Sequence, residues 1–133
     1  MKKVFLGGTC NGSKWRDSFI PELKLAYFQP QSDEWTPAMM TEEIKERAEC
    51  DFCLYVITPK MTGVYSIAEV VDDSNKRPGK TIFCYLTVDE QHLFSAAQIK
   101  SLEQTGKLIR ANGATFLKDL AETADYLNRH SQE

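Results

Sequence analysis

The sequence lacks any long apolar run, and this absence excludes one large class of protein. No hydrophobic segment approaches the roughly 18 residues that a membrane-spanning helix needs, so no membrane partner is expected. The opening segment, MKKVFLGG, carries two lysines and a few apolar residues. Its apolar part is far too short for a signal peptide, and we expect no export leader.

An excess of positive charge is also missing. The chain has 16 Lys and Arg residues against 19 Asp and Glu residues, which gives a formal net charge of −3. Proteins that bind polymeric nucleic acid present a basic face to the phosphates. We therefore expect no nucleic-acid polymer as a partner.

A complete set of metal ligands is absent as well. Cys50 and Cys53 have CxxC spacing, but no second pair and no histidine cluster completes a zinc site. We expect neither a metal nor a cofactor. Cys53 and Cys84 fall inside expected strands, where free cysteine behaves as a small buried hydrophobe. These features favour reduced cysteines in a cytoplasmic protein.

What the chain does have is a regular alternation of strand-like and helix-like segments. Its 133 residues suffice for one domain, residues 1–133, with a real core. Strands are expected at residues 3–6, 25–28, 52–57, 81–86 and 114–116, and helices from about residue 14 and over about 37–50, 66–76, 95–109 and 117–129. This alternation predicts an α/β fold with an open parallel sheet and helices on both faces. With five strands, the flavodoxin-like order 2-1-3-4-5 is the natural choice.

The helix over residues 37–50 has a clear start and an apparent inner face. Thr36 and Pro37 form a good N-cap and first-position pair. Met40, Ile44 and Ala48 recur at helical spacing, so we expect them to face the core.

The stretch that organises the chain is DFCLYVITPKMTGVYSIAE, residues 51–69. An unbroken apolar run predicts a strand buried on both faces, and a helix follows with Glu69 near its start. Glu69 has two interpretations. It forms a capping box with Ser66, or it is a catalytic carboxylate at the carboxyl end of a parallel strand, where such sheets place their ligand sites.

A second signal comes from the loop after the first strand, GGTCNGSKWRD. Its small residues let the backbone approach a ligand closely, and Ser13 is suited to cap the next helix. No GxGxxG occurs, so this is not the dinucleotide fingerprint. The loop predicts a phosphate, ribose or carboxylate site, or else a plain strand-to-helix turn. In the order 2-1-3-4-5, strands one and three are neighbours, so this loop and residues 58–66 would flank one crevice with Glu69.

Three stretches resemble a known family. VFLGGTCNGSKWRD, YFQPQSDEWTP and ECDFCLYVITPKMTGVYSIAEVVDDSNKRPGKTIFCYL, within about the first 86 residues, are similar to the nucleoside 2-deoxyribosyltransferase-like family, notably its short phage and bacterial members. The resemblance implies a flavodoxin-like fold and cleavage of the N-glycosidic bond of nucleosides or nucleotides. It also implies that Glu69 is the nucleophile, forming a covalent sugar ester as in retaining glycosidases.

Further residues take roles by the same resemblance. Glu43 falls where relatives carry a second acidic residue, and Trp15 and Trp35 either stack on the base or pack in the core. The loop residues that would hold the sugar or a 5′-phosphate are Gly7, Gly8, Thr9, Asn11, Ser13 and Arg16, together with Gly63, Tyr65 and Ser66 beside Glu69. Relatives usually form oligomers with sites near subunit boundaries, so a homo-oligomer is expected.

Two departures from the family pattern affect the expected reaction. Many transferases carry an aspartate in the loop before the glutamate, but residues 58–68 contain no acid. The C-terminal SQE also lacks the aromatic residue that some transferases lend to a neighbour. Glycosidic cleavage is therefore better supported than base exchange. Hydrolysis of NAD or of a nucleotide remains an alternative, as does a non-catalytic domain that binds a nucleotide-like signal.

Overall fold

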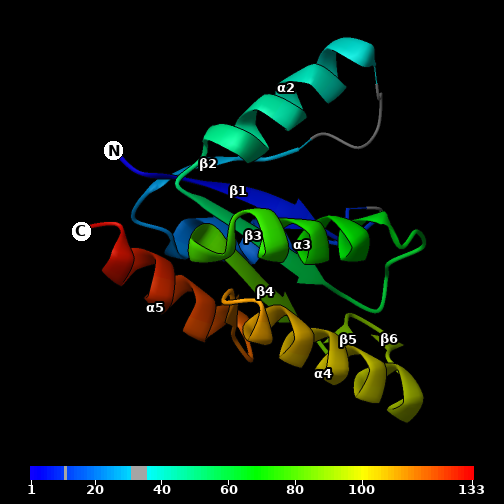
Figure 1. Cartoon of the computed structure of the whole chain (residues 1–133). Helices are drawn as coiled ribbons and strands as arrows, with labels where there is room; N and C mark the ends of the chain where they lie inside the picture. The colour runs from blue at the N-terminus through cyan, green and yellow to red at the C-terminus, as the bar shows by residue number, and fades with distance from the viewer. Residues whose placement is uncertain (11, 31–35) are drawn as a thin grey trace.

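The computed structural model describes residues 1–10, 12–30 and 36–133. Within these ranges, parallel strands form one sheet in the order β2-β1-β3-β4-β7. The strands are β1 (Lys3–Gly8), β2 (Ala26–Phe28), β3 (Phe52–Ile57), β4 (Thr81–Tyr85) and β7 (Thr115–Phe116). Since β7 is the fifth strand of this sheet, the predicted order 2-1-3-4-5 is confirmed, and the arrangement is consistent with a flavodoxin-like open sheet (Figure 1).

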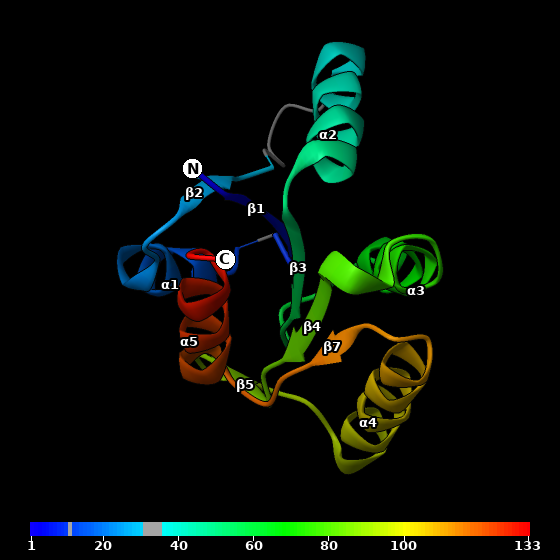
Figure 2. The ribbon, with the colours of Figure 1, turned by 60° about the vertical axis from the view of Figure 1, so that its left-hand side comes forward.

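Helices cover both faces of the sheet. On one face lie α1 (Trp15–Phe19) and α5 (Leu120–His130), and on the other α3 (Tyr65–Lys76) and α4 (Ala96–Ala111) (Figure 2). Short 3₁₀ turns follow α1 and α3. They are Ile20–Glu22, which contains Pro21, and Pro78–Lys80, which begins with Pro78. The prolines fit the first turn of a helix because they lack the N–H that would go unpaired there.

The central strand β3 shows why its sequence is an unbroken apolar run. All six of its residues are buried, because β1 and β4 flank it and helices cover both faces. Leu54 and Val56 pack in the core with α1 and α5, whereas Tyr55 and Ile57 pack in the core with α3 and α4. A strand of this kind has no solvent face, so the usual polar alternation disappears.

Helix α2 (Pro37–Glu49) departs from the prediction. Thr36 caps it as expected, since its side chain accepts a hydrogen bond from the Met39 N–H. The predicted inner face is wrong, because Met40 and Ile44 are 39% and 59% exposed and Ala48 is exposed too. The N-terminal part of α2 extends away from the sheet (Figure 1), and none of the residues of the helix is buried. Periodicity shows which side chains share a face, but not whether anything lies against that face.

A small hairpin was not predicted. Strands β5 (Val88–Asp89) and β6 (His92–Leu93) pair antiparallel between β4 and α4. Strands of two residues are too short to produce an alternating pattern. The turn between them includes Glu90 at a φ of 55°, in the left-handed region.

Gly8 ends β1 directly opposite Val56 of β3. The close approach of the two backbones at this point can be tested by mutation. The φ of Gly8 is +107°, and a Cβ at this position would lie 2.0 Å from the Val56 carbonyl oxygen. We expect Gly8→Ala to lower the free energy of unfolding by at least about 2 kcal/mol, because it combines a disfavoured φ with a backbone clash. The control is Gly63→Ala, where a Cβ meets nothing within 4 Å and where a change of less than about 1 kcal/mol is expected. Urea unfolding of both variants makes the comparison, and equal effects would contradict it.

Candidate functional site

The carboxyl ends of β1 and β3 lie side by side, with Gly8 paired to Val56. The loops that leave these ends are joined directly, because the Thr9 Oγ1 accepts a hydrogen bond of 2.9 Å from the Thr58 N–H. Helix α3 starts just beyond the second loop. Both predicted signals therefore meet at one place, the switch point between β1 and β3 where open α/β sheets bind ligands.

Glu69 lines a cavity of about 280 Å³ between α2 and α3. Its walls are Phe5, Met40, Glu43, Ile44, Arg47, Tyr65 and Glu69. The two carboxylic acids that the resemblance selected, Glu69 and Glu43, thus share one cavity although they lie on different helices. Glu43 also borders a neighbouring cavity of about 330 Å³ that Phe28 and Met39 line.

The carboxylate of Glu69 is held by Arg47, a residue that the sequence did not single out. Arg47 Nη1 lies 3.0 Å from Glu69 Oε2. The same guanidinium donates through Nε and Nη2 to Asp73, at 3.1 Å each to the nearer oxygen, and through Nη2 to Asp72 at 3.3 Å. Asp73 has no exposed surface, and it also accepts a 2.5 Å hydrogen bond from the Tyr55 hydroxyl.

The surroundings shift the acidity of both glutamates in the same direction. Burial raises the pKa of Glu69; Arg47 opposes this effect, and the negative charges of Asp73 and Glu43 add to it. Burial also raises the pKa of Glu43. Two carboxyl groups with raised pKa values in one cavity are suited to nucleophilic and acid–base chemistry.

The capping box between Ser66 and Glu69 is not present. Helix α3 has Val64 as its N-cap, without a side-chain capping bond, and Glu69 pairs with Arg47 instead. Since α3 begins at Tyr65, Glu69 lies at the start of the second turn, slightly later than predicted. The side chain is 23% exposed and borders the cavity.

A second, smaller cavity of about 150 Å³ adjoins the first through Tyr65, which lines both. Its other walls are Gly8, Thr9, Cys10, Ile57, Met61, Thr62, Gly63 and Ser66. Five of the predicted substrate-binding residues therefore lie around one cavity: Gly8, Thr9, Gly63, Tyr65 and Ser66.

Two further predicted residues, Gly7 and Trp15, have packing roles. The Gly7 backbone packs against the Tyr55 ring, which a Cβ would meet at 2.9 Å. Trp15 is 4% exposed and donates from Nε1 to the Thr9 carbonyl, so it packs in the core. Asn11 and Trp35 lie outside the described residues.

The side chain of Arg16, which was expected to help hold the sugar or a 5′-phosphate, is directed to the backbone instead. It is 5% exposed and stacks over the Trp15 ring at 4.4 Å. Its Nε and Nη2 donate to the Leu6 carbonyl, and Nη1 donates to the Thr9 carbonyl. The guanidinium therefore supplies hydrogen-bond donors to the buried carbonyls of Leu6 and Thr9.

Ser13 does not cap α1 either. Lys14 is the N-cap residue, without a side-chain capping bond. The Ser13 hydroxyl instead donates to Asp89 Oδ2 at 2.5 Å, and the Thr58 hydroxyl donates to the same oxygen at 2.6 Å. One carboxylate of the β5–β6 hairpin thus ties together the two loops that flank the site.

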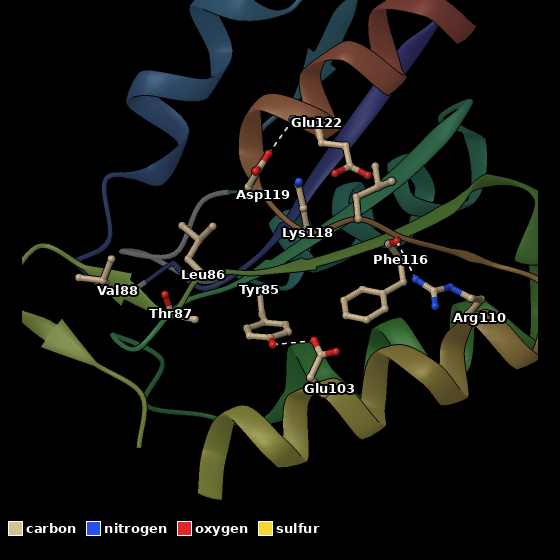
Figure 3. Close-up of a pocket in the computed structure, with 11 residues that line it drawn as sticks. Tyr85, Leu86, Thr87, Val88, Glu103, Arg110, Phe116, Lys118, Asp119 and Glu122 are labelled. Atoms are coloured by element: carbon tan, nitrogen blue, oxygen red, sulfur yellow. Dashed lines mark hydrogen bonds between the residues drawn. The ribbon is translucent and has the colours of Figure 1, made fainter. Parts of the chain in front are cut away.

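A larger cavity than either of these lies elsewhere. It measures about 450 Å³ and is formed where β4 and β7 end, between α4 and the start of α5 (Figure 3). Several of its polar groups bond to one another: the Tyr85 hydroxyl donates to Glu103, and Arg110 donates to the Phe116 carbonyl. Size alone does not make a catalytic site, and these polar groups are already occupied with one another.

Two of the buried cysteines are held as protonated thiols. The four cysteines are free, as predicted. Burial raises the pKa of the Cys84 thiol to about 12 and that of Cys53 to about 11, so neither forms the nucleophilic thiolate at neutral pH. Among the described residues, no group of three or more His, Cys, Asp or Glu side chains is placed to hold a metal ion. No helix in these ranges is long and apolar enough to cross a bilayer.

The buried contact between Arg47 and Asp73 can be tested on stability. Asp73→Asn removes a charge that has no exposed surface and leaves Arg47 and Arg77 without their buried partner. We expect the free energy of unfolding to fall by about 3 kcal/mol. Asp72→Asn is the matched control, because that carboxylate is 42% exposed and should change stability by less than about 1 kcal/mol. Urea unfolding measures both, and two equally small changes would contradict the expectation.

Comparison with known proteins agrees with this geometry. A family model described as "Nucleoside 2-deoxyribosyltransferase like" matches residues 1–87. The matched part contains β1 to β4, both site loops, Glu43, Arg47 and Glu69. No curated protein matches the chain. Because the match covers well over half of the 133 residues, the chain belongs to the nucleoside 2-deoxyribosyltransferase-like family.

Proposed function

We propose that this protein cleaves the N-glycosidic bond of a nucleoside through a covalent intermediate on Glu69, and that it passes the sugar to a second base or to water. Family membership associates the chain with nucleoside deoxyribosyltransferase-like activity. The observation that carries the finer proposal is the shared cavity of Glu69 and Glu43, which opens beside the small-residue loop cavity.

The proposed first step breaks the bond between the anomeric carbon and the base nitrogen. A Glu69 oxygen attacks the anomeric carbon and forms an ester, while the bonding electron pair leaves with the base nitrogen. Positive charge develops on the sugar as the base departs, and the fixed carboxylate stabilises it. In the second step, water or another base attacks the same carbon, and the carboxylate of Glu69 is restored.

Glu43 is the residue that we assign to the departing base. It faces the same cavity as Glu69, and its pKa is raised by burial. A carboxyl group with a raised pKa holds its proton closer to neutral pH and can deliver it to the base nitrogen as the bond breaks. The same group then accepts a proton from the incoming water or base.

The cavity around Gly8 and Ser66 would take the sugar. Backbone from the start of α3 borders it, and the partial positive charge of a helix N-terminus suits hydroxyl or phosphate oxygens. None of the described residues that line this cavity is Lys or Arg, and the Arg16 guanidinium is bonded to backbone carbonyls. A 5′-phosphate would find no cationic partner among these residues, which favours an unphosphorylated nucleoside over a nucleotide or NAD.

Replacement of the nucleophile tests the reaction. In Glu69→Gln, an amide takes the place of the carboxylate, and an amide is a poor nucleophile towards the anomeric carbon. We expect base release to fall by at least about 10³-fold, measured by chromatography on a panel of ribonucleosides, deoxyribonucleosides, nucleotides and NAD. Intact-protein mass spectrometry of the wild type after a short reaction should show an adduct of one sugar, and the variant should show none.

The control is Glu103→Gln, which changes the same functional group in the larger cavity (Figure 3). This variant should release base at the wild-type rate. Loss of activity in Glu103→Gln with full activity in Glu69→Gln would place the reaction in the cavity of Glu103 and overturn the proposal. A wild type that binds nucleosides without releasing base would identify a binding domain instead.

We also propose that the protein works as a homo-oligomer whose contact lies beside the site. Ile44 and Tyr65 line the Glu69 cavity while remaining 59% and 73% exposed, and neighbouring Val64 is 68% exposed. Exposed apolar residues gathered at one place favour an interface. A contact there would cover the open side of the cavity.

Light scattering tests the assembly. At micromolar concentration we expect a mass of at least twice the 15.1 kDa of one chain, because interfaces of standard size hold at this concentration. Ile44→Arg should lower the mass towards one chain. Leu108→Arg, on the distant helix α4 and 51% exposed, should not. A wild-type mass of about 15 kDa would contradict the proposal.

A further inference from the structure

Arg47 is the cation closest to the proposed nucleophile. It comes from the last turn of α2, whereas Glu69 lies on α3, and an ion pair of 3.0 Å joins the two helices. We propose that Arg47 is the positioning residue of Glu69: its positive charge balances this carboxylate, and its hydrogen bond fixes which of the two oxygens attacks. The inference rests on the proposed function and assigns a role in it to a residue outside the set that the sequence selected.

The guanidinium is itself held rigidly. Its Nε and Nη2 bind Asp73 on one side, and Nη1 reaches Glu69 on the other. Such a planar fork fixes the direction of all its donors at once. A lysine at this position would supply the charge without the direction.

Asp73 provides the fixed point from which this direction is set. Its side chain has no exposed surface, and it accepts a hydrogen bond of 2.5 Å from Tyr55 in the middle of β3. Arg77, the C-cap residue of α3, lies 3.3 Å from its other oxygen. Since strand β3 and helix α3 together determine where Asp73 lies, they also determine where Arg47 points.

This geometry distinguishes the two oxygens of Glu69. Arg47 binds Oε2, whereas Oε1 has no hydrogen bond to any residue in the described ranges. We assign Oε1 to the bond with the anomeric carbon. Oε2 then keeps the hydrogen bond to Arg47 while the ester exists, as its carbonyl oxygen.

The charge balance also survives the reaction. When Glu69 becomes an ester it loses its negative charge, which would strand a buried cation that had no other partner. Arg47 remains neutralised, because the buried carboxylate of Asp73 stays bound to it through Nε and Nη2. The covalent intermediate therefore forms without leaving an unpaired charge behind.

The pKa of Glu69 depends on the charged and titratable groups around it. Helix α2 contributes Glu43 and Arg47, and α3 itself contributes Asp72 and Asp73, with Tyr55 of β3 bonded behind them. Arg47 is the cation in this group, and it opposes the rise in the pKa of Glu69 that burial causes. Removal of Arg47 should therefore raise that pKa further.

The test compares Arg47→Met with Arg47→Lys in the full-length protein. Two readouts are used: the pH profile of kcat/KM for the best nucleoside, and the ¹³C signal of the Glu69 carboxyl group against pH, assigned by its absence in Glu69→Gln. In Arg47→Met we expect the acid limb and the Glu69 titration to move together to higher pH, by about one pH unit or more. In Arg47→Lys, the retained charge should keep both within about half a pH unit of the wild type, while kcat falls at least about tenfold because the oxygen is no longer directed.

Asp72→Asn is the matched control, since it removes one contact of Arg47 without touching Glu69. It should leave the Glu69 titration and kcat near those of the wild type. If Arg47→Met does not fold because Asp73 is left without its main partner, Arg47→Gln removes the same charge while its amide N–H can still donate to Asp73, and it carries the same readouts.

Two failures can be told apart. A lower melting temperature in Arg47→Met, with unchanged Glu69 titration and an unchanged acid limb, would make Arg47 a structural residue and overturn this inference alone. A wild type that releases no base from any member of the panel would overturn the proposed function and, with it, the nucleophile that Arg47 is said to position.

Discussion

The structure depends on one buried charge, the carboxylate of Asp73. A carboxylate without exposed surface is costly unless opposite charges and hydrogen bonds compensate it. Here the compensation comes from three elements: Tyr55 of β3, Arg47 of α2, and Arg77 at the end of α3. The need to neutralise Asp73 therefore draws a strand and two helices together at the place where Glu69 lies.

Helix α2 depends on this cluster more than any other helix does. None of its residues is buried, so packing of an apolar face contributes little to its position. Its last turn is held by polar contacts instead: Lys3 pairs with Glu46, and the Lys80 ammonium donates to the Ala48 and Cys50 carbonyls. Cations at the carboxyl end of a helix also interact favourably with its dipole. The helix that carries Glu43 and Arg47 is thus anchored at one end.

The fold could be predicted because its signals are local. An apolar run such as 52–57 can only be a covered strand in a chain of alternating elements, and Ser95 with Gln98 forms the capping box that its spacing favours. The carboxylate site followed from the same logic, since the ends of β1 and β3 must meet in this strand order. Glu69 and Glu43 were then selected by resemblance to a family, and the structure places both in one cavity.

The polar partners could not be predicted, because each depends on contacts between distant segments. Arg47 is one of several charged residues on its helix, and nothing in its spacing marks it as the one that faces α3. Asp73 carries a partial signal, because it lies three residues after Val70 and so on the same inward face of the helix. A buried acid requires a cation, but the sequence does not say which one. Arg16 misled for the same reason: an arginine in a small-residue loop suggests an anion, and only the fold shows that it turns inward to backbone carbonyls.

The bridge between Ser13 and Thr58 depends on Asp89, a residue beyond the part of the chain that the family model matches. The part shared with the family ends at residue 87, just before this aspartate. Glu43, Arg47 and Glu69 thus lie in the matched region, whereas the carboxylate that ties the two site loops together comes from a hairpin outside it. Changes in that hairpin can therefore alter the spacing of the two loops without touching the helices that carry Glu43, Arg47 and Glu69.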